Sequence, residues 1–274
     1  MKGASRKLRS FRNEWTDLRD RICRNPSRQL LHRFRRSCRK WQAVLALPEP
    51  GKPGPVCRRL GKDLRRCLRR SRGLRNADVL QKFLRENNLD LTLPFFDKKE
   101  RVLFCRSLRK TRPGRKKDFR KCTKYLGLEF SEKGIGDKID LGGRQKDAFE
   151  DLAKAHAIWN QDPAHDFSSL HRIRIRLKKI AGQEAFLEDL PGTRIPLSER
   201  QKSDLKNLLR HLGKMSDLTL LKETVPELKG TGEEKERLEH ILSEGLMKIG
   251  KEIEAILGKV PDEHPGGMKV LKRK

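Results

Sequence analysis

The sequence is poor in aromatic residues and has no long apolar run. Of its 274 residues one is tyrosine and three are tryptophan, and aromatic residues make up 5% of the chain. No stretch approaches the 18 or more uninterrupted apolar residues of a membrane-spanning helix. The first residues are basic and lack the apolar segment of a secretory signal. We therefore expect a cytoplasmic protein without a membrane span.

The usual signatures of metal, redox and nucleotide chemistry are also missing. None of the six cysteines forms a C-x-x-C pair, which argues against a zinc ribbon or a redox pair. Cys38, Cys57 and Cys67 share helical positions with leucines, and we expect them to be buried and reduced. There is no Gly-x-x-x-x-Gly-Lys loop followed by Ser or Thr, and no paired carboxylates stand beside the basic segments to hold Mg²⁺. We expect no catalytic residues, no metal and no cofactor. An enzyme that uses a phosphohistidine or a metal is the less supported alternative.

Positive charge, in contrast, is abundant and unevenly distributed. The chain has 66 lysines and arginines against 37 aspartates and glutamates, a net charge of +29. Residues 1–130 hold 39 against 12, a net of +27, whereas residues 131–274 hold 27 against 25. A positive electrostatic field of this size predicts a polyanionic partner, which we expect to be attracted first to residues 1–130. A basic half that serves only solubility is the alternative, but its self-repulsion would destabilise the fold.

Apolar residues recur at intervals of three and four along nearly the whole chain, which predicts an all-α protein. Proline and glycine mark the boundaries between helices. The predicted domains are a basic bundle over 1–130, a glycine-containing linker over 131–142, a second bundle over 143–260 and a flexible basic tail over 261–274. Helices are expected over 5–23, 27–47, 55–72, 74–88, 98–111, 115–126, 143–160, 167–187, 198–212, 214–224 and 232–258.

A short motif occurs once in each half. Residues 31–40 and 170–179 both begin Leu-His-Arg-x-Arg, and each has a basic pair seven and eight positions after the histidine. The copies lie 139 residues apart, which indicates a duplicated helical unit. On a helical wheel, His171, Arg174 and Lys178 lie on one side, away from the apolar stripe. The same arrangement, a histidine followed by basic residues on one side of the helix, occurs in both halves. We therefore expect these histidines to belong to a binding site and not to be purely structural.

The segment after the first motif is more basic still. Eight cations fall within 15 residues between Arg58 and Arg72, and only Asp63 opposes them. Like charges at i and i+4 repel each other and disfavour an isolated helix. A solvated face would normally mix glutamate with lysine. The pattern therefore indicates that an anion supplies the missing charge.

These residues resemble the conserved histidine α-helical domain (CHAD) family. Its motif His-x-x-Arg-x-x-x-basic-basic occurs in both halves, and a later family motif has weaker matches at Leu74–Val79 and Leu212–Thr219. The resemblance covers about residues 5–258. It implies two pseudo-symmetric helical bundles forming one CHAD-type unit, with a basic surface or pore where they meet. No Glu-x-Glu-x-Lys motif of an adjacent triphosphatase domain is found, so the chain looks like a stand-alone module.

The resemblance also implies non-catalytic binding of inorganic polyphosphate, with association with polyphosphate granules as a further expectation. Arginine can give two parallel hydrogen bonds to one phosphate group, and a histidine beside phosphate favours its charged form. No obligate protein partner is implied. The residues expected to bind polyphosphate are His32, Arg35, Arg36, Arg39, Lys40, Arg58, Lys62, Arg65, Arg66, Arg69, Arg75, His171, Arg174, Lys178 and Lys179. Asp78 and Asp217 are expected to orient arginines.

The main alternative is a protein that binds the phosphate backbone of RNA or DNA. Basic helices alone do not exclude it, because phosphate contacts supply most non-specific affinity. The scarcity of aromatic residues for base stacking and the absence of a zinc-finger or RNA-recognition signature argue against it. Binding to an anionic membrane surface is a further alternative, although the charged helices are also needed for packing.

Overall fold

The computed structural model describes residues 2–25, 27–47, 54–89, 91, 104–106, 108, 112–132, 141–161, 167–188 and 197–257. Within these ranges the regular elements are helical, which confirms the predicted all-α class. The helices are α1 (Lys2–Arg24), α2 (Arg28–Val44), α3 (Pro55–Arg70), α4 (Arg72–Glu86), α6 (Arg112–Glu132), α8 (Leu141–Gln161), α9 (Phe167–Leu187), α10 (Glu199–Thr224), the 3₁₀ turn η1 (Val225–Glu227) and α11 (Gly232–Leu257).

Local sequence signals explain where several helices begin. The Ser27 hydroxyl accepts a hydrogen bond from the Leu30 N–H at 3.2 Å and caps α2. Pro55 is the first residue of α3, where its missing N–H costs nothing. At α10, Ser198 and Gln201 exchange backbone and side-chain hydrogen bonds in a capping box.

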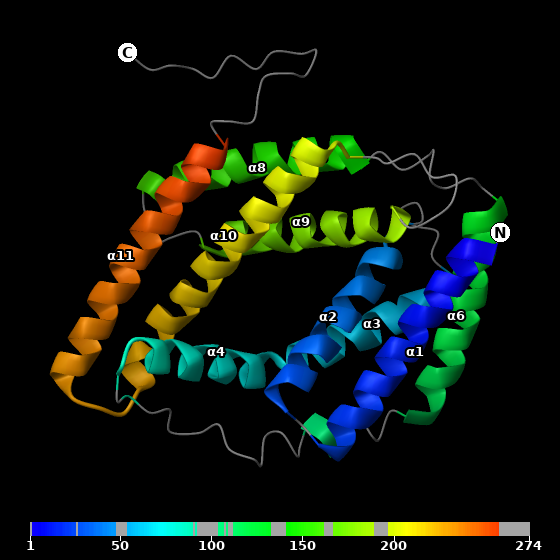
Figure 1. Cartoon of the computed structure of the whole chain (residues 1–274), viewed down its shortest axis with the longest axis horizontal. Helices are drawn as coiled ribbons and strands as arrows, with labels where there is room; N and C mark the ends of the chain where they lie inside the picture. Colours follow the sequence, from blue (N-terminus) through cyan, green and yellow to red (C-terminus); the bar gives the residue numbers. More distant parts are fainter. Residues whose placement is uncertain are drawn as a thin grey trace.

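Four helices close a ring around the centre of the molecule (Figure 1). α2 packs against α9, α9 against α10, α10 against α4, and α4 against α2. The ring therefore joins two helices of the first half with two of the second. Outside it, α1 and α3 pack against α2, α6 covers α1 and α3, α8 lies along α9, and α11 lies along α10.

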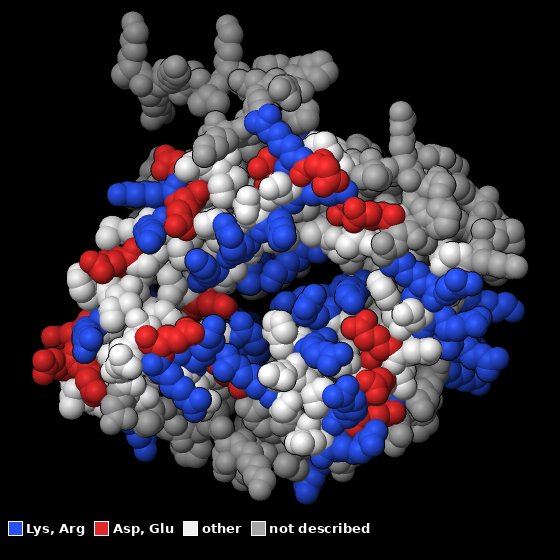
Figure 2. Space-filling view, in the orientation of Figure 1, with Lys and Arg blue, Asp and Glu red and all other residues white. Residues whose placement is uncertain are grey.

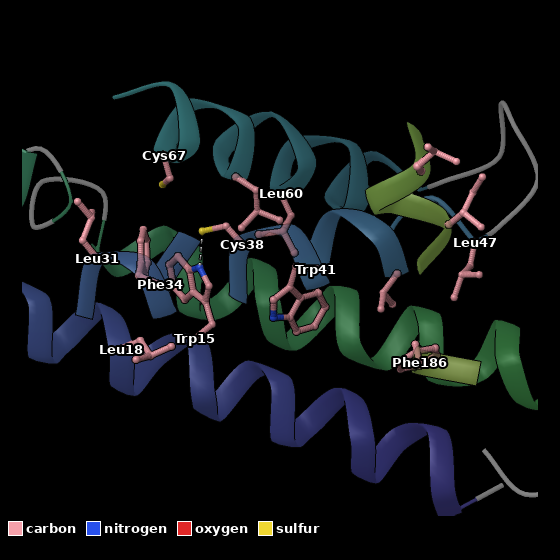
Figure 3. Packing of buried hydrophobic residues seen from close by; sticks show 14 of the residues in the cluster. Trp15, Leu18, Leu31, Phe34, Cys38, Trp41, Leu47, Leu60, Cys67 and Phe186 are labelled. Carbon is pink, nitrogen blue, oxygen red and sulfur yellow. Dashed lines mark hydrogen bonds between the residues drawn. The ribbon is translucent and has the colours of Figure 1, made fainter. Parts of the chain in front are cut away.

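Aromatic side chains form the centre of the main apolar core (Figure 3). The Phe119 ring of α6 lies 4.5 Å from the ring of Trp15 and 4.9 Å from that of Trp41. Trp15 Nε1 lies 3.3 Å from Cys38 Sγ, and Trp41 Nε1 donates to the Phe11 carbonyl at 3.3 Å. Both indole N–H groups thus have partners, as buried tryptophans require. This packing ties α1, α2 and α6 into one unit.

The apolar stripes of the two histidine helices enter that same core. The stripe of α2 is Leu31, Phe34, Cys38 and Trp41, each at most 2% exposed, and that of α9 is Leu170, Ile173, Leu177 and Ile180, each at most 8% exposed. Near their C-terminal ends the helices approach closely, and the Gln183 amide donates to the Ala43 carbonyl at 3.2 Å. With their stripes buried, α2 and α9 direct their cationic rows out of the core.

A smaller core cluster lies at the far end of the ring. Leu80 and Leu84 of α4 pack with Leu221 of α10, Val225 of η1 and Leu238 of α11. It anchors the C-terminal half of α4 against α10 and α11. The N-terminal half of α4 is thereby held in place as one side of the ring.

Some predicted boundaries differ from the structure. The sequence suggested two helices separated at Gly213, but α10 is continuous from Glu199 to Thr224. Its buried leucines on either side of Gly213 compensate for the low helix propensity of one glycine. The segment expected as a helix over 98–111 falls largely outside the described residues, as do 133–140 of the predicted linker and the tail 261–274. The division into two pseudo-symmetric bundles stays a prediction.

Candidate functional site

Lysine and arginine side chains surround the central hollow of the ring (Figure 2). They lie on both sides of the opening between α9 and the pair α2 and α4. Charged side chains of α2 and α4 lower the pKa of basic groups on α9, and those of α4 lower the pKa of basic groups on α2, so we treat all of them as one cluster. We call the following seven side chains the central cation cluster: His32, Arg35, Arg39, Arg75, His171, Arg174 and Lys178.

Helix α2 supplies three members of the cluster at i, i+3 and i+7. Arg35 is only 8% exposed and donates from Nη1 to the Leu68 carbonyl at 2.7 Å and to the Ser71 hydroxyl. Burial and the charge of Arg39 lower the pKa of Arg35 to about 10. Arg35 therefore fixes α2 to the junction of α3 and α4, while Arg39 reaches solvent.

Helix α9 supplies the matching row from the second half. Burial and the charges of Arg174 and Arg39 lower the pKa of Lys178 to about 7. Burial also lowers the pKa of Arg174 to about 10, although Asp217 opposes that change. The Nε atom of Arg174 is buried and has no hydrogen-bond partner among the described residues. The row thus contains cations whose charge is costly to maintain in the free protein.

The two remaining sides of the ring contribute an ion pair. Arg75 Nη2 of α4 lies 3.3 Å from Asp217 Oδ2 of α10, and both side chains are partly exposed. The Asp217 carboxylate also raises the pKa of Arg39, Arg174 and Lys178 against the effect of burial. This is the geometry expected of an aspartate that orients an arginine. Asp217 is an internal counter-ion, but one carboxylate neutralises only a fraction of the cluster.

The two histidines are surrounded by arginines. Burial lowers the pKa of His32, and the charge of Arg75 acts in the same direction. Burial likewise lowers the pKa of His171, with smaller contributions from Arg174 and Arg72. Both imidazoles are therefore mainly neutral at pH 7 in the free protein, because the ordinary pKa of histidine is about 6.5. An anion in the hollow would reverse this balance and favour the imidazolium form.

Other residues of the two predicted motifs lie at or beyond the edge of the cluster. Arg36 is exposed beside His32 and lowers its pKa. Lys40 faces α1, where its Nζ is 3.2 Å from Glu14 Oε2 and 5.2 Å from the centre of the Phe11 ring. The pKa of Lys179 is lowered mainly by burial, with smaller contributions from the charges of Arg144 of α8 and Arg65 of α3. The cluster therefore contains the histidine, the arginine three residues later and the first residue of the basic pair from each motif. The second residue of each pair, Lys40 or Lys179, lies outside it.

The predicted residues of α3 lie on its exposed surface. Arg58, Lys62, Arg65 and Arg69 share one side of the helix. Arg66 lies on a neighbouring side and pairs with Asp63 at 3.5 Å. The helix as a whole packs its cysteine and leucine stripe against α2 and α6.

Two cations near the site were absent from the predicted set. Arg72, the first residue of α4, lowers the pKa of both His171 and Arg35. Its spacing of three residues from Arg69 was a signal that it continues the α3 row. Arg144 of α8 lowers the pKa of Lys179, but α8 carries no basic row that could have revealed it.

Over the residues that the structure describes, histidine, cysteine, aspartate and glutamate side chains form no group suited to metal binding. The described helices also include none that is long and apolar enough to cross a membrane. What the hollow offers instead is a set of nitrogen donors and positive charges from three helices.

Comparison with known proteins identifies a family for the chain. A search of curated proteins finds no match. The family model for the CHAD domain, however, matches residues 6–226, a span that includes both histidine rows and the whole central cation cluster. Domains of this family are known in general to bind polyphosphate and are generally non-catalytic. Because the match spans about four fifths of the 274 residues, the chain belongs to the CHAD family.

Proposed function

We propose that this protein binds inorganic polyphosphate in the central cation cluster without cleaving it. The observation that carries the proposal is the excess of positive charge enclosed by the ring. Two rows from α2 and α9, joined by Arg75, face one another with Asp217 as the carboxylate that acts on them. Phosphate oxygens would supply the missing negative charge and accept the hydrogen bonds of the guanidinium groups.

The electrostatics of the free protein support a phosphate ligand in particular. Desolvation lowers the pKa of Arg39, Arg174 and Lys178, and the unpartnered Nε of Arg174 is a buried donor. A ligand with several charged oxygens but no base or sugar can meet these donors without needing aromatic stacking. In a cell, the same binding would recruit the protein to polyphosphate granules.

Binding of the purified chain to long-chain polyphosphate tests this proposal, with RNA and heparin as competitors at about 150 mM salt. The informative variant is Arg39→Gln/Arg174→Gln. Arg35 is avoided because its hydrogen bonds hold α2 to the α3–α4 junction. A matched control is Arg120→Gln/Lys121→Gln, which removes two exposed charges from α6.

We expect polyphosphate to remain bound in excess competitor and the Arg39→Gln/Arg174→Gln variant to lose at least tenfold in affinity. Charge-assisted hydrogen bonds contribute about 1.5–3 kcal/mol each, so two lost arginines suffice for that effect. The control should lose much less. Equal affinity for all three polyanions would reduce the site to a generic basic surface and favour nucleic acid. Release of orthophosphate by the native protein would contradict the non-catalytic part.

A further inference from the structure

The exposed side of α3 carries two rows of cations with different surroundings. The first row consists of Arg58, Lys62, Arg65 and Arg69, spaced so that they lie along one side of the helix. We call it the open row. All four side chains are exposed, and within the described residues none of them forms an ion pair.

The second row on the same helix is partly neutralised. Arg59 Nη1 lies 4.0 Å from Asp118 Oδ1 of α6, and Arg66 Nη1 lies 3.5 Å from Asp63 Oδ1. Both carboxylates are largely shielded, with exposed fractions of 17% and 22%. Two rows of similar composition, about 100° apart on one helix, thus differ in whether the protein supplies their counter-charge.

The open row continues from the central cation cluster. Arg35 of the cluster donates to the Leu68 carbonyl and the Ser71 hydroxyl, which places the C-terminal end of α3 beside the cluster. Arg72, the first residue of α4, follows Arg69 by three residues and lowers the pKa of His171 and Arg35. Farther along the row, Arg65 lowers the pKa of Lys179. From Arg58 to Arg69, within α3, the helical rise of 1.5 Å per residue gives a length of about 17 Å. The open row is therefore a line of exposed positive charges that begins beside the hollow and continues along α3.

We propose that the open row is a second segment of the same polyphosphate site and makes affinity depend on chain length. A short chain would contact the central cation cluster alone. A longer chain, once held there, would extend along α3 and meet the open row at a high effective concentration. The row gives repeated charges about 5–6 Å apart and no enclosing shape, which suits a flexible linear polyanion. This inference rests on the proposed function of the central cluster.

The experiment compares tripolyphosphate with long-chain polyphosphate as probes at about 150 mM salt. Three double variants of the full chain are measured with both probes. Lys62→Gln/Arg69→Gln removes two charges from the open row, the control Arg120→Gln/Lys121→Gln removes two exposed charges from α6, and Arg39→Gln/Arg174→Gln removes two from the central cluster. Far-ultraviolet circular dichroism checks that each variant keeps its helices.

The expected result is a loss that depends on chain length. Lys62→Gln/Arg69→Gln should weaken long-chain binding about fivefold, the size expected for two exposed ionic contacts, and leave tripolyphosphate nearly unchanged. Arg120→Gln/Lys121→Gln should change neither affinity by more than about twofold. Arg39→Gln/Arg174→Gln should weaken both probes.

Two outcomes would overturn the role of the open row while the proposed function stands. One is an equal loss for both probes in Lys62→Gln/Arg69→Gln. The other is the same loss of long-chain affinity in Lys62→Gln/Arg69→Gln and in Arg120→Gln/Lys121→Gln, since the change in net charge alone would then explain it. Failure of the proposed function is distinguishable, because Arg39→Gln/Arg174→Gln would then leave the affinity for both probes unchanged.

Discussion

At the scale of single side chains, the charge of Lys178 depends strongly on its surroundings. Its pKa is lowered to about 7 by burial and by Arg174, Arg39 and Arg75, while Asp217 opposes the shift. At neutral pH the free protein therefore holds this lysine in a mixture of charged and neutral forms. Phosphate oxygens in the hollow would favour the ammonium form and raise its pKa again.

This predicts that polyphosphate binding takes up protons and weakens as pH rises from 6 to 8.5. Above pH 7 the affinity should fall by up to about tenfold per pH unit for each proton taken up. The histidines act in the same direction, because the pKa values of His32 and His171 are also lowered in the free protein. Titration calorimetry in two buffers with different ionisation enthalpies measures the proton uptake directly.

Lys178→Arg is the matched variant for this pH effect. Its guanidinium stays charged throughout the range, so it should bind well at pH 8 and show a flatter profile than the native protein. Proton uptake that is unchanged in Lys178→Arg would show that another group is responsible. The pH dependence of folding stability in the free protein has the opposite sign. Because the pKa of Lys178 is lower in the folded protein, the unfolded chain binds more protons between about pH 7 and 10, and folding stability rises with pH in this range.

At the scale of helices, two glycines have opposite surroundings. A Cβ atom at Gly182 of α9 would lie 2.8 Å from the Cβ of Ala43 on α2, which is too close without a shift of one helix. A Cβ at Gly213 of α10 would lie 3.5 Å from Nη2 of Arg174, an ordinary contact. Gly182 therefore sets the distance between the two histidine helices, whereas Gly213 lies inside a helix that could accept alanine.

We expect Gly182→Ala to destabilise the protein by about 1–3 kcal/mol, the usual cost of overpacking. Gly213→Ala should stabilise it by up to about 1 kcal/mol through its higher helix propensity. For a chain of this size each kcal/mol corresponds to a shift of about 2–4 °C in Tm. Thermal unfolding measures both variants side by side. A Gly182→Ala protein as stable as the native one would show that α2 and α9 are not in tight contact.

The same elements show how far the sequence could predict the structure. Helical periodicity identified the buried stripes of α2 and α9, and the repeated motif predicted two cationic rows on the opposite sides. It did not show that Arg35 would be buried against Leu68 and Ser71, or that Lys40 would face Glu14. A helical wheel gives the direction of a side chain on its own helix. The helix that it meets depends on tertiary packing.

At the scale of the whole molecule, the net charge of +29 acts on stability and binding in opposite ways. Most of this charge belongs to residues 1–130, which include α2, α3 and α4. Repulsion among these helices destabilises the compact state, and a bound polyanion would relieve it. Dissolved salt relieves the same repulsion by screening, but it also weakens the attraction of a polyanion to the protein.

These two effects predict that the Tm values of the free and the polyphosphate-bound protein converge as the salt concentration increases. Between 50 and 500 mM NaCl, the Tm of the free protein should rise, whereas the increase in Tm caused by long-chain polyphosphate should shrink. Thermal unfolding with and without a fixed concentration of polyphosphate gives both curves in one series.

Arg39→Gln/Arg174→Gln is the informative comparison, because it removes two repelling charges along with two expected ligand contacts. It should raise the Tm of the free protein at low salt and reduce the increase due to polyphosphate. A ligand-induced increase that is independent of salt would contradict electrostatic binding in the hollow.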